Sequence, residues 1–516
     1  MPTFYDRVKV LTATAGAGPI TLGAAVPPHR TFAGAGVPHR AVVSYLIEDG
    51  ASWETGRGFY DAVAGVLTRF QFQSSNTGAQ LVLSGNATVS IIGSAADLSA
   101  LSSGQGVARR SNIMTVLPHQ PMADAGTGAT ARTFHLLQTM EAHFDGVRIG
   151  FVNNLATTQT ISFAVASANA PGLNADASTR DPTAAGGTWV AGTFAGAATA
   201  ITNLPTVTTS AATRNAAPGI TWSDWIGLSS IDRLDGGLPL LHLRMLVTPT
   251  SGNVPTSIVG TGGNTFQDEI EAAYAAGRLF RIREYAGDAL ADKTLMTSNL
   301  QTWTLPVVII QYLSRTEGHS LLVLGDSITT AANLPTWTTK STQWPFILRN
   351  RLSRPDRPVE LINAGWSSQS MPDFANRFVK MVADGIAPTL VVSAGYSPNT
   401  FTSITAVEEA RWRAGLSRIV AAARSIGAPV MPWGTLPSDP SIKPFGATDA
   451  KRVAWHNRLL QHPNFVDVRT LVPVTIDGNG QEVPAAGYFS DGLHPTTMLA
   501  GLMADAMTPT SSLLLA

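Results

Sequence analysis

The pattern of apolar and polar positions changes near residue 318. Before it, short runs of alternating or β-branched residues are separated by Gly, Asn and Asp, which is typical of antiparallel strands joined by turns. The runs occupy residues 8–10, 42–47, 67–70, 88–92, 147–152, 161–165, 241–247 and 307–310. This texture predicts a β-rich N-terminal part, in which only residues 268–279 have the pattern of a helix.

After Gly318 short apolar strands alternate with segments of helical periodicity. The predicted strands are 321–324, 359–362, 390–393, 430–433 and 465–468. The predicted helices are 344–352, 374–383, 407–426, 449–460 and 496–507. Strands and helices of these lengths predict a parallel sheet with helices on both faces. The active site of such a sheet lies where the strands end, at their carboxyl edge.

These textures predict three domains: a β-rich module over residues 1–97, a β-sandwich over residues 98–315, and a three-layer α/β domain over residues 316–516. Within the sandwich, the stretch from Ala166 to Gly219 is dominated by Ala, Thr, Gly, Pro and Ser. That composition indicates either long loops that decorate the sandwich or a mobile segment.

Composition excludes several classes of function. Lys and Arg number 35, Asp and Glu also 35, and charged residues make up 14% of the chain, against about 25% in an average soluble protein. We therefore expect no nucleic-acid partner. The chain has no cysteine, which excludes disulfides, thiolate metal sites and a cysteine nucleophile. We expect no membrane insertion and no export signal, because long apolar runs and a signal-peptide pattern are both missing.

Two short motifs carry the groups of a nucleophilic hydrolase. A buried strand runs into Gly325-Asp326-Ser327, and Asp491 and His494 stand three residues apart before the last predicted helix. A serine hydroxyl is a poor nucleophile at neutral pH, so it needs a histidine to take its proton and a carboxylate to orient the imidazole. Each motif alone is also ordinary turn or helix-start chemistry. Together they predict Ser327, Asp491 and His494 as a catalytic triad.

Two further turns follow strands at the same predicted edge. They are Asn363-Ala364-Gly365 and Gly395-Tyr396-Ser397-Pro398-Asn399. Acyl transfer needs hydrogen-bond donors aimed at the developing oxyanion. The backbone N–H groups of Ser327 and Gly365 and the side-chain amide of Asn399 form a candidate oxyanion hole, although Gly and Asn are also the default residues of turns.

These four blocks, in this order and on these elements, resemble the SGNH hydrolases, also called GDSL-type esterases, over about residues 316–516. The resemblance implies a serine ester hydrolase without a cofactor. It assigns the triad to Ser327, Asp491 and His494, and the oxyanion hole to Ser327, Gly365 and Asn399.

The third block departs from the family pattern. The family usually has Gly-x-Asn-Asp, whereas here Ser397 stands at the asparagine position and Asn399 follows two residues later. Either side chain is a candidate third donor. We favour Asn399, because its amide offers two N–H donors and no rotating hydroxyl.

The start of the chain resembles a module found at the start of tailed-phage and prophage fibre or spike proteins. The similar segments are Asp6–Lys9, Ile20–Gly23, Ile47–Gly50 and Trp53–Gly56. The resemblance implies attachment to a virion, contacts with other tail or spike proteins, and a homo-oligomer. The alternative is an ordinary β domain of a bacterial enzyme.

The middle region precedes the hydrolase as a β-sandwich precedes the catalytic domain in some carbohydrate esterases of this superfamily. Trp189, Trp222 and Trp225 are candidate sugar-stacking platforms, although aromatic residues of a sandwich more often belong to its core. No motif for nucleotides, zinc peptidases or ordinary α/β-hydrolases is present. The ten histidines lack metal-ligand spacing, so neither a metal nor a cofactor is expected.

The expected function is that of a phage or phage-like spike or tail-fibre esterase. It would act at the bacterial cell surface and remove acyl groups, foremost acetyl, from surface polysaccharide. Two alternatives stay open at this point: a non-catalytic glycan-binding adhesin on the same fold, and a free-standing bacterial esterase or lipase.

Overall fold

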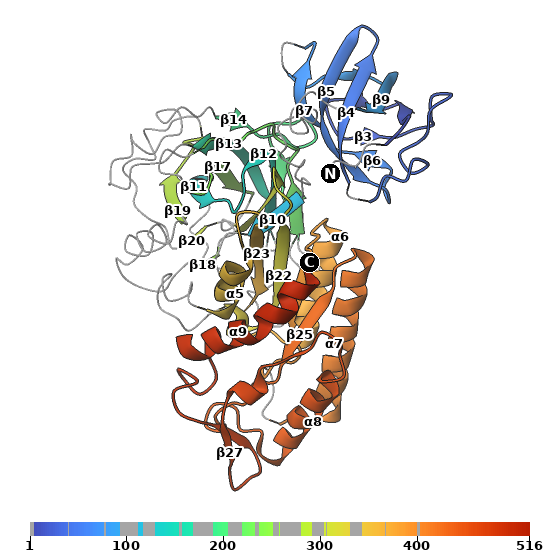
Figure 1. Cartoon of the computed structure of the whole chain (residues 1–516). Coiled ribbons are helices and arrows are strands. Elements are labelled where there is room, and N and C mark those ends of the chain that lie inside the picture. Colours follow the sequence, from blue (N-terminus) through green and yellow to red (C-terminus); the bar gives the residue numbers. More distant parts are fainter. Residues whose placement is uncertain are drawn as a thin grey trace.

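The computed structural model describes residues 5–39, 41–76, 79–92, 112–116, 130–153, 157–168, 189–204, 219–232, 237–250, 257–258, 280–290, 304–305, 307–330, 343–366, 368–399 and 403–515. A β-rich N-terminal part is followed by an α/β C-terminal part, as the sequence predicts (Figure 1). The helix predicted over 268–279 and the boundary predicted at residues 97 and 98 lie outside the described residues.

The first sheet is antiparallel and has seven strands, in the order β1-β9-β4-β5-β6-β3, with β7 paired to β5. The strands are β1 (Lys9–Thr12), β3 (Ile20–Thr21), β4 (Val42–Asp49), β5 (Ser52–Asp61), β6 (Val66–Leu67), β7 (Phe70–Ser74) and β9 (Ala87–Ile91); β2 (Ala15–Gly16) pairs with β8 (Leu83–Ser84). The single run predicted over 67–70 is divided between β6, which ends at Leu67, and β7, which begins at Phe70.

Two further antiparallel sheets follow. One has the order β10-β21-β12-β16, and the other β14-β13-β17-β11-β19 with β15 beside β13. Their strands are β10 (Asn112–Val116), β11 (Arg132–Thr139), β12 (Phe144–Asn153), β13 (Gln159–Ala168), β14 (Val190–Ala191), β15 (Ala200–Ile201), β16 (Gly219–Trp222), β17 (Leu240–Pro249), β19 (Phe280–Ala286) and β21 (Val307–Ser314); β18 (Ser257–Ile258) pairs with β20 (Thr304–Leu305). Buried side chains from both sheets form one cluster, as in a sandwich.

The C-terminal sheet is parallel, in the order β23-β22-β24-β25-β26. Its elements are β22 (His319–Gly325), α3 (Ser327–Thr330), α5 (Trp344–Leu352), β23 (Val359–Gly365), α6 (Met371–Ala383), β24 (Leu390–Ala394), α7 (Ala406–Ser425), β25 (Val430–Gly434), α8 (Asp449–Leu459), β26 (Val466–Asp467) and α9 (Thr497–Leu514), with a hairpin of β27 (Val474–Ile476) and β28 (Glu482–Pro484). The predicted strands and helices are confirmed, except that β26 is shorter and α9 continues through Pro509 beyond its predicted end.

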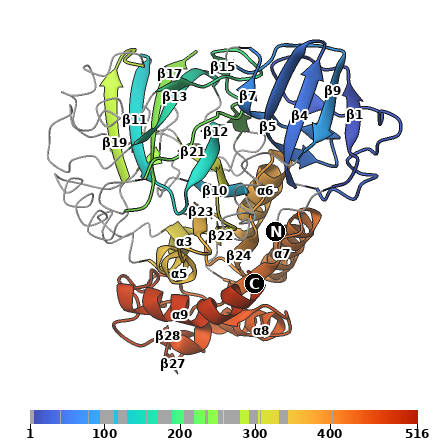
Figure 2. The ribbon, with the colours of Figure 1, turned by 45° about the horizontal axis from the view of Figure 1, so that its top comes forward.

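Strand order explains why helices cover both faces. The chain passes from β22 to β23 in one direction and then crosses back over β22 to β24. Since such connections are right-handed, α5 lies on one face and α6, α7 and α8 on the other. Figure 2 shows α5 beside α9, and α6 beside α7. The direction reverses at β22, so the loops after β22, β23 and β24 meet at the kind of edge where α/β proteins bind ligands.

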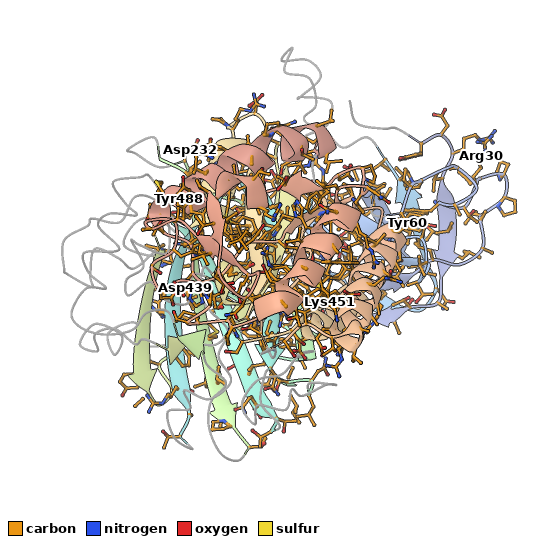
Figure 3. All side chains as sticks on the ribbon, turned by 90° about the horizontal axis from the view of Figure 1, so that it is seen from below. Arg30, Tyr60, Asp232, Asp439, Lys451 and Tyr488 are labelled. Carbon is orange, nitrogen blue, oxygen red and sulfur yellow. The ribbon has the colours of Figure 1, made fainter. Side chains whose placement is uncertain are left out.

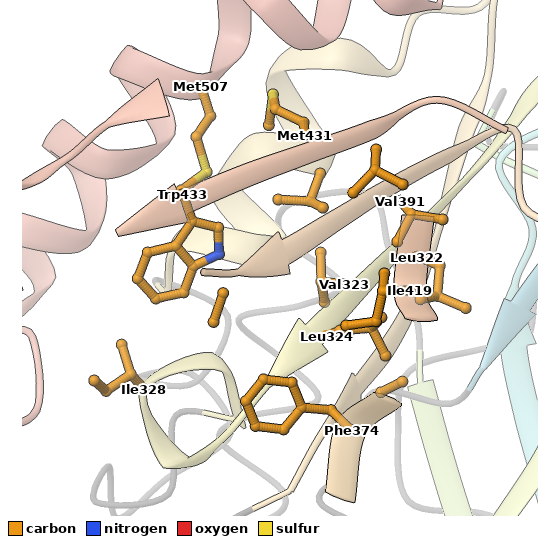
Figure 4. Packing of buried hydrophobic residues seen from close by; sticks show 14 of the residues in the cluster. Leu322, Val323, Leu324, Ile328, Phe374, Val391, Ile419, Met431, Trp433 and Met507 are labelled. Carbon is orange, nitrogen blue, oxygen red and sulfur yellow. The ribbon is translucent and has the colours of Figure 1, made fainter. Parts of the chain in front are cut away.

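The central strands of this sheet are apolar on both sides. Leu321 to Leu324 are all fully buried, as expected for a strand covered by helices on each face. Figure 4 shows Leu322, Val323 and Leu324 in one cluster with Phe374 of α6, Trp433 of β25 and Met507 of α9. The cluster fixes the strand that ends at the serine motif.

The sandwich and the C-terminal part pack against each other at an interface, which we call the joint. Val152, Ile220 and Ile309 of the sandwich belong to the same buried cluster as the parallel sheet. Polar groups also cross: Arg349 Nη1 of α5 lies 2.6 Å from Glu141 Oε1. Glu360 Oε1 of β23 accepts hydrogen bonds from Tyr312 Oη (2.7 Å) and from the Glu141 N–H (2.8 Å). Burial, and beyond it the Glu141 carboxylate, raises the pKa of Glu360 to about 7.

Within the described ranges, no helix is both long and apolar enough to span a membrane.

Candidate active site

The loop after β22 holds Ser327 at the carboxyl edge of the sheet. The turn needs a glycine, because a Cβ on Gly325 would lie 2.1 Å from Thr329 Oγ1. The Gly325 carbonyl accepts from the Trp366 N–H at 3.0 Å. Beyond the nucleophile, Trp344 Nε1 donates to the Ile328 carbonyl at 3.2 Å. The serine side chain is therefore carried by a turn that is fixed on both sides.

The structure brings Ser327, His494 and Asp491 into one hydrogen-bonded chain. His494 Nε2 lies 2.8 Å from Ser327 Oγ, and His494 Nδ1 lies 2.7 Å from Asp491 Oδ2. The other carboxylate oxygen, Asp491 Oδ1, accepts the backbone N–H groups of Leu493 (3.1 Å) and His494 (2.8 Å). The imidazole thus lies between a hydroxyl and a carboxylate, which is the arrangement that general-base activation of a serine requires.

Neighbouring loops fix the segment that carries the acid and the base. Gly492 has a φ of +83°, and a Cβ there would lie 2.6 Å from the Asp439 Cβ. The Asp439 N–H donates to the Gly492 carbonyl at 2.8 Å, and the Thr496 N–H donates to the Tyr488 carbonyl at 2.9 Å. Figure 3 labels Asp439 and Tyr488 in this part of the molecule. The positive φ and the close contact with Asp439 explain why the residue directly after Asp491 is a glycine.

The environment of Asp491 keeps its carboxylate ionised. Burial alone raises its pKa, but the hydrogen bonds from the His494 backbone and side chain outweigh that effect. The pKa of Asp491 therefore lies below its ordinary value. A carboxylate in this state stabilises the imidazolium that forms when the histidine takes a proton.

The buried hydroxyl of Ser397 in the third block contacts the first block and the loop after β23. Ser397 Oγ lies 2.6 Å from Asp326 Oδ2 and 2.9 Å from the Gln369 carbonyl oxygen. Asn399 Nδ2 donates to the same carbonyl at 3.1 Å, and the Asn399 N–H donates to Ser397 Oγ at 3.3 Å. The single proton of the Ser397 hydroxyl is used inside the protein, whereas the Asn399 amide has a second N–H, which favours Asn399 as the third donor. The assignment of Asn399 stays a prediction.

The loop after β23 differs from our expectation. The Gly365 N–H, expected to face the oxyanion, donates instead to Asn363 Oδ1 at 3.0 Å, because the Asn363 side chain folds back over its own loop. Asn363 Nδ2 in turn donates to the Thr329 carbonyl at 3.2 Å. In this structure Gly365 therefore uses its N–H to shape the loop, and Asn363 joins that loop to the helix of Ser327.

The same loop contains Ser368, a residue with a strained backbone conformation. Its φ of +61° lies in the left-handed region that favours glycine. Strained backbone of this kind gathers at functional sites. Its neighbours Trp366 and Gln369 contact the first and third blocks through their backbones. Sequence reasoning missed Ser368, because a serine at this position gives no sign of an unusual φ.

Sequence reasoning also missed Asp326 as a structured part of the site. Its side chain is 2% exposed, and its Oδ1 accepts the Ile328 N–H at 3.0 Å. Burial raises the pKa of Asp326, against the opposing effects of the hydrogen bonds from Ser397 and Ile328 and the His494 charge. The available sign was a charged residue directly after a fully buried strand.

The three candidate stacking tryptophans make contacts within the protein. Trp222 Nε1 donates to the Asp384 carbonyl at 2.6 Å, and its ring centroid lies 4.3 Å from the Arg148 guanidinium carbon. The same guanidinium lies 5.4 Å from the Trp225 ring, and the Arg244 guanidinium lies 4.3 Å from the ring of Trp189. These contacts favour a packing role for all three side chains.

Among the residues that the structure describes, no group of three or more His, Asp or Glu side chains is placed to hold a metal ion.

Residues 323–498 match the model of the GDSL-like Lipase/Acylhydrolase family. The matched segment contains the serine, asparagine, aspartate and histidine blocks described above. This segment is a GDSL-like lipase/acylhydrolase domain. No curated protein matches the chain.

Several solved structures resemble the chain that carries this GDSL-like domain. TesA shares 22% identity, with 38% of this chain and 99% of TesA covered at a TM-score of 0.26. The protein YXIM of Bacillus subtilis shares 13% identity, with 77% of this chain and 89% of its own covered at a TM-score of 0.30. A two-domain esterase active on acetylated mannans shares 13% identity, with 38% and 50% covered at a TM-score of 0.28.

Proposed function

We propose that the GDSL-like domain hydrolyses esters through Ser327, with His494 as general base and Asp491 as the group that orients it. The hydrogen-bonded chain from Asp491 through His494 to Ser327 carries this proposal. A serine, an imidazole and an ionised carboxylate in series provide a nucleophile, a proton acceptor and a stabiliser for the cation that forms.

The proposed reaction has two steps. Ser327 Oγ attacks the ester carbonyl carbon while His494 Nε2 takes its proton; the alcohol then leaves with that proton, and an acyl-enzyme remains. Water, deprotonated by the same imidazole, attacks the acyl carbon; the bond to Ser327 Oγ breaks, His494 returns the proton to that oxygen, and the acid is released. The Ser327 N–H, the Asn399 amide and an N–H from the loop after β23 hold the oxyanion of each step.

We further propose that the substrate is an acyl ester, foremost an acetyl ester, of a bacterial surface polysaccharide. The β-rich part ahead of the GDSL-like domain supports this proposal, since it follows the plan of carbohydrate esterases in which a sandwich precedes the catalytic domain. The proposed setting is a phage or phage-like spike or tail fibre, to which residues 1–97 would attach the protein. The similarity of that region to fibre-start modules supports it.

Acetate release tests the proposed activity. Purified protein is incubated with an aryl acetate and with acetylated host polysaccharide, and Ser327→Ala serves as the inactive control. Release of acetate from both substrates by the parent protein alone supports the proposal. An inactive parent that binds polysaccharide would favour the adhesin, and activity on the aryl acetate alone would favour an ordinary esterase.

Particle incorporation tests the proposed setting. A phage lacking the gene is complemented with the full chain or with a chain that begins at Leu98, and purified particles are assayed for esterase. We expect particles to carry only the full chain, while both soluble proteins are active. Equal incorporation would refute the attachment role of residues 1–97.

A further inference from the structure

The Ser397 hydroxyl lies between two acceptors but has only one proton. Its oxygen is 2.6 Å from Asp326 Oδ2 and 2.9 Å from the Gln369 carbonyl oxygen, and the Ser397 side chain is completely buried. A carbonyl oxygen only accepts, and a carboxylate accepts as long as it is ionised. The charge state of Asp326 therefore decides where the hydroxyl proton goes.

With Asp326 ionised, the Ser397 proton points to the carboxylate. The Gln369 carbonyl is then left to the Asn399 amide, which donates one N–H to it at 3.1 Å. The second N–H of the same amide group is held in a fixed direction. Ser397 Oγ also has a lone pair for the Asn399 backbone N–H at 3.3 Å.

With Asp326 protonated, the order of donors reverses. The carboxylic acid donates to Ser397 Oγ, and the Ser397 proton turns to the Gln369 carbonyl. The Asn399 amide then shares its acceptor with a hydroxyl, and its orientation is less firmly fixed. Protonation of Asp326 thus affects the candidate oxyanion donor through a series of three hydrogen bonds.

We propose that Asp326 is a positioning residue whose ionised carboxylate orients the Asn399 amide through Ser397 and the Gln369 carbonyl. The inference rests on the proposed esterase function, since it concerns the donors of that reaction. It also explains why three loops converge on one buried hydroxyl: Asp326 follows β22, Gln369 follows β23, and Ser397 and Asn399 follow β24.

Titratable groups of neighbouring elements interact with Asp326. They are His494 of the loop before α9, Lys443 of the loop after β25, and the phenol of Tyr396 in the third block. Because His494 takes up a proton in the same proposed reaction, pH dependence alone does not separate the two groups. A double-mutant cycle does.

The substitution Asp326→Asn mimics the protonated carboxyl. In this variant Oδ1 still accepts the hydrogen bond from the Ile328 N–H. The amide nitrogen then takes the place of Oδ2 and donates a hydrogen bond to Ser397 Oγ. We expect Asp326→Asn to lower kcat for an aryl acetate ~10-fold, the size of one weakened charge-assisted hydrogen bond. In the Asn399→Ala background the same change should lower kcat less than ~2-fold, because its target is gone. KM should be nearly unchanged in both.

A second variant and a control keep the test decisive. Ser397→Ala breaks the relay without touching Asp326, and we expect it to lower kcat and to couple with Asn399→Ala in the same way. Asp477→Asn makes the same chemical change at the β27–β28 turn, where the carboxylate accepts the Asn479 N–H. It should leave kcat unchanged. Unfolding temperatures verify that each variant is folded.

The outcomes separate this inference from the function on which it rests. A parent protein without esterase activity overturns the proposed function. In an active parent, equal losses from Asp326→Asn with and without Asn399 overturn only the positioning role, as does a Ser397→Ala variant with parental kcat.

Discussion

The two β-rich regions ahead of the GDSL-like domain differ in how each one buries its apolar residues. The buried cluster of the first sheet draws on residues between Tyr5 and Ile91 alone. In the sandwich, by contrast, Val152, Ile220 and Ile309 belong to the core of the parallel sheet. The Glu141 N–H also donates to Glu360 of that sheet, and the Glu141 carboxylate accepts from Arg349 of α5. Figure 1 shows the first sheet to one side of the other two regions.

This difference indicates which parts of the chain depend on one another. A region with its own core folds and melts as a unit, whereas regions that share a core and buried ion pairs lose stability together. We therefore expect the first sheet to be separable from the chemistry. The sandwich should be part of the structure that supports the active site.

The largest expected effect tests whether the chemistry depends on the nucleophile of the GDSL-like domain. Ser327→Ala should lower turnover of an aryl acetate by ~10⁴–10⁶-fold, because the nucleophile is lost. Steady-state kinetics measures the loss, and unchanged thermal unfolding shows that both β-rich regions stay intact. Turnover within tenfold of the parent would place the nucleophile elsewhere.

The next largest expected effect is a loss of stability that is limited to the first sheet. Arg69 donates from Nε to Glu54 Oε1 at 3.1 Å and from Nη2 to the Leu81 carbonyl at 2.8 Å, and Glu54 is fully buried. Arg69→Ala leaves that carboxylate without its counter-charge, which should cost about 3–5 kcal/mol. Calorimetry should show an early transition for this sheet, with kcat unchanged at temperatures below it. A parallel loss of kcat would mean that the first sheet supports the active site.

A smaller effect separates the two candidate donors of the third block. Asn399→Ala should lower kcat by ~10²–10³-fold, as expected for a lost oxyanion donor. Ser397→Ala should lower it by ~10-fold, since that hydroxyl acts only through hydrogen bonds to its neighbours. Parallel kcat measurements on a single aryl acetate compare them. The reverse order of effects would identify Ser397 as the donor.

The smallest effect concerns the joint between the sandwich and the GDSL-like domain. The pKa of Glu360 rises from 4.5 to about 7 on folding. Its contribution to stability is therefore complete below about pH 4.5 and is lost as the pH rises through about 7. Stability of the shared core should fall by on the order of 1–3 kcal/mol over that interval.

Glu360→Gln tests this joint, because glutamine keeps the accepting Oε1 and has no charge to bury. The variant should flatten the dependence of the free energy of unfolding on pH, measured by urea denaturation from pH 5 to pH 8. An unchanged pH dependence would show that another group is responsible.

The sequence predicts the parallel sheet closely because its strands are continuous apolar runs and its helices keep a regular period. The triad is also readable, since Ser327, Asp491 and His494 sit in short local motifs. Hydrogen bonds between loops cannot be predicted from local motifs. The use of the Gly365 N–H by Asn363, and the meeting of Asp326, Gln369 and Ser397, depend on how three strand ends are placed in space.

The joint between sandwich and sheet also escapes sequence reasoning. Glu360 lies within a predicted strand, where a charged residue is usually taken as facing solvent. In the structure it is buried against Tyr312 and Glu141, which precede it by 48 and 219 residues. Nothing in the local pattern around Glu360 indicates partners so distant in the chain.

The distance in sequence between Ser327 and His494 has a consequence for synthesis. The two residues that share the 2.8 Å hydrogen bond are 167 positions apart, and four of the five strands of the sheet lie between them in the chain. A ribosome translates the nucleophile long before its base. The nascent hydrolase region therefore has no assembled triad until residue 494 has left the ribosome and the segment that ends in α9 has folded against the sheet. The proposed esterase is inactive during most of its own translation.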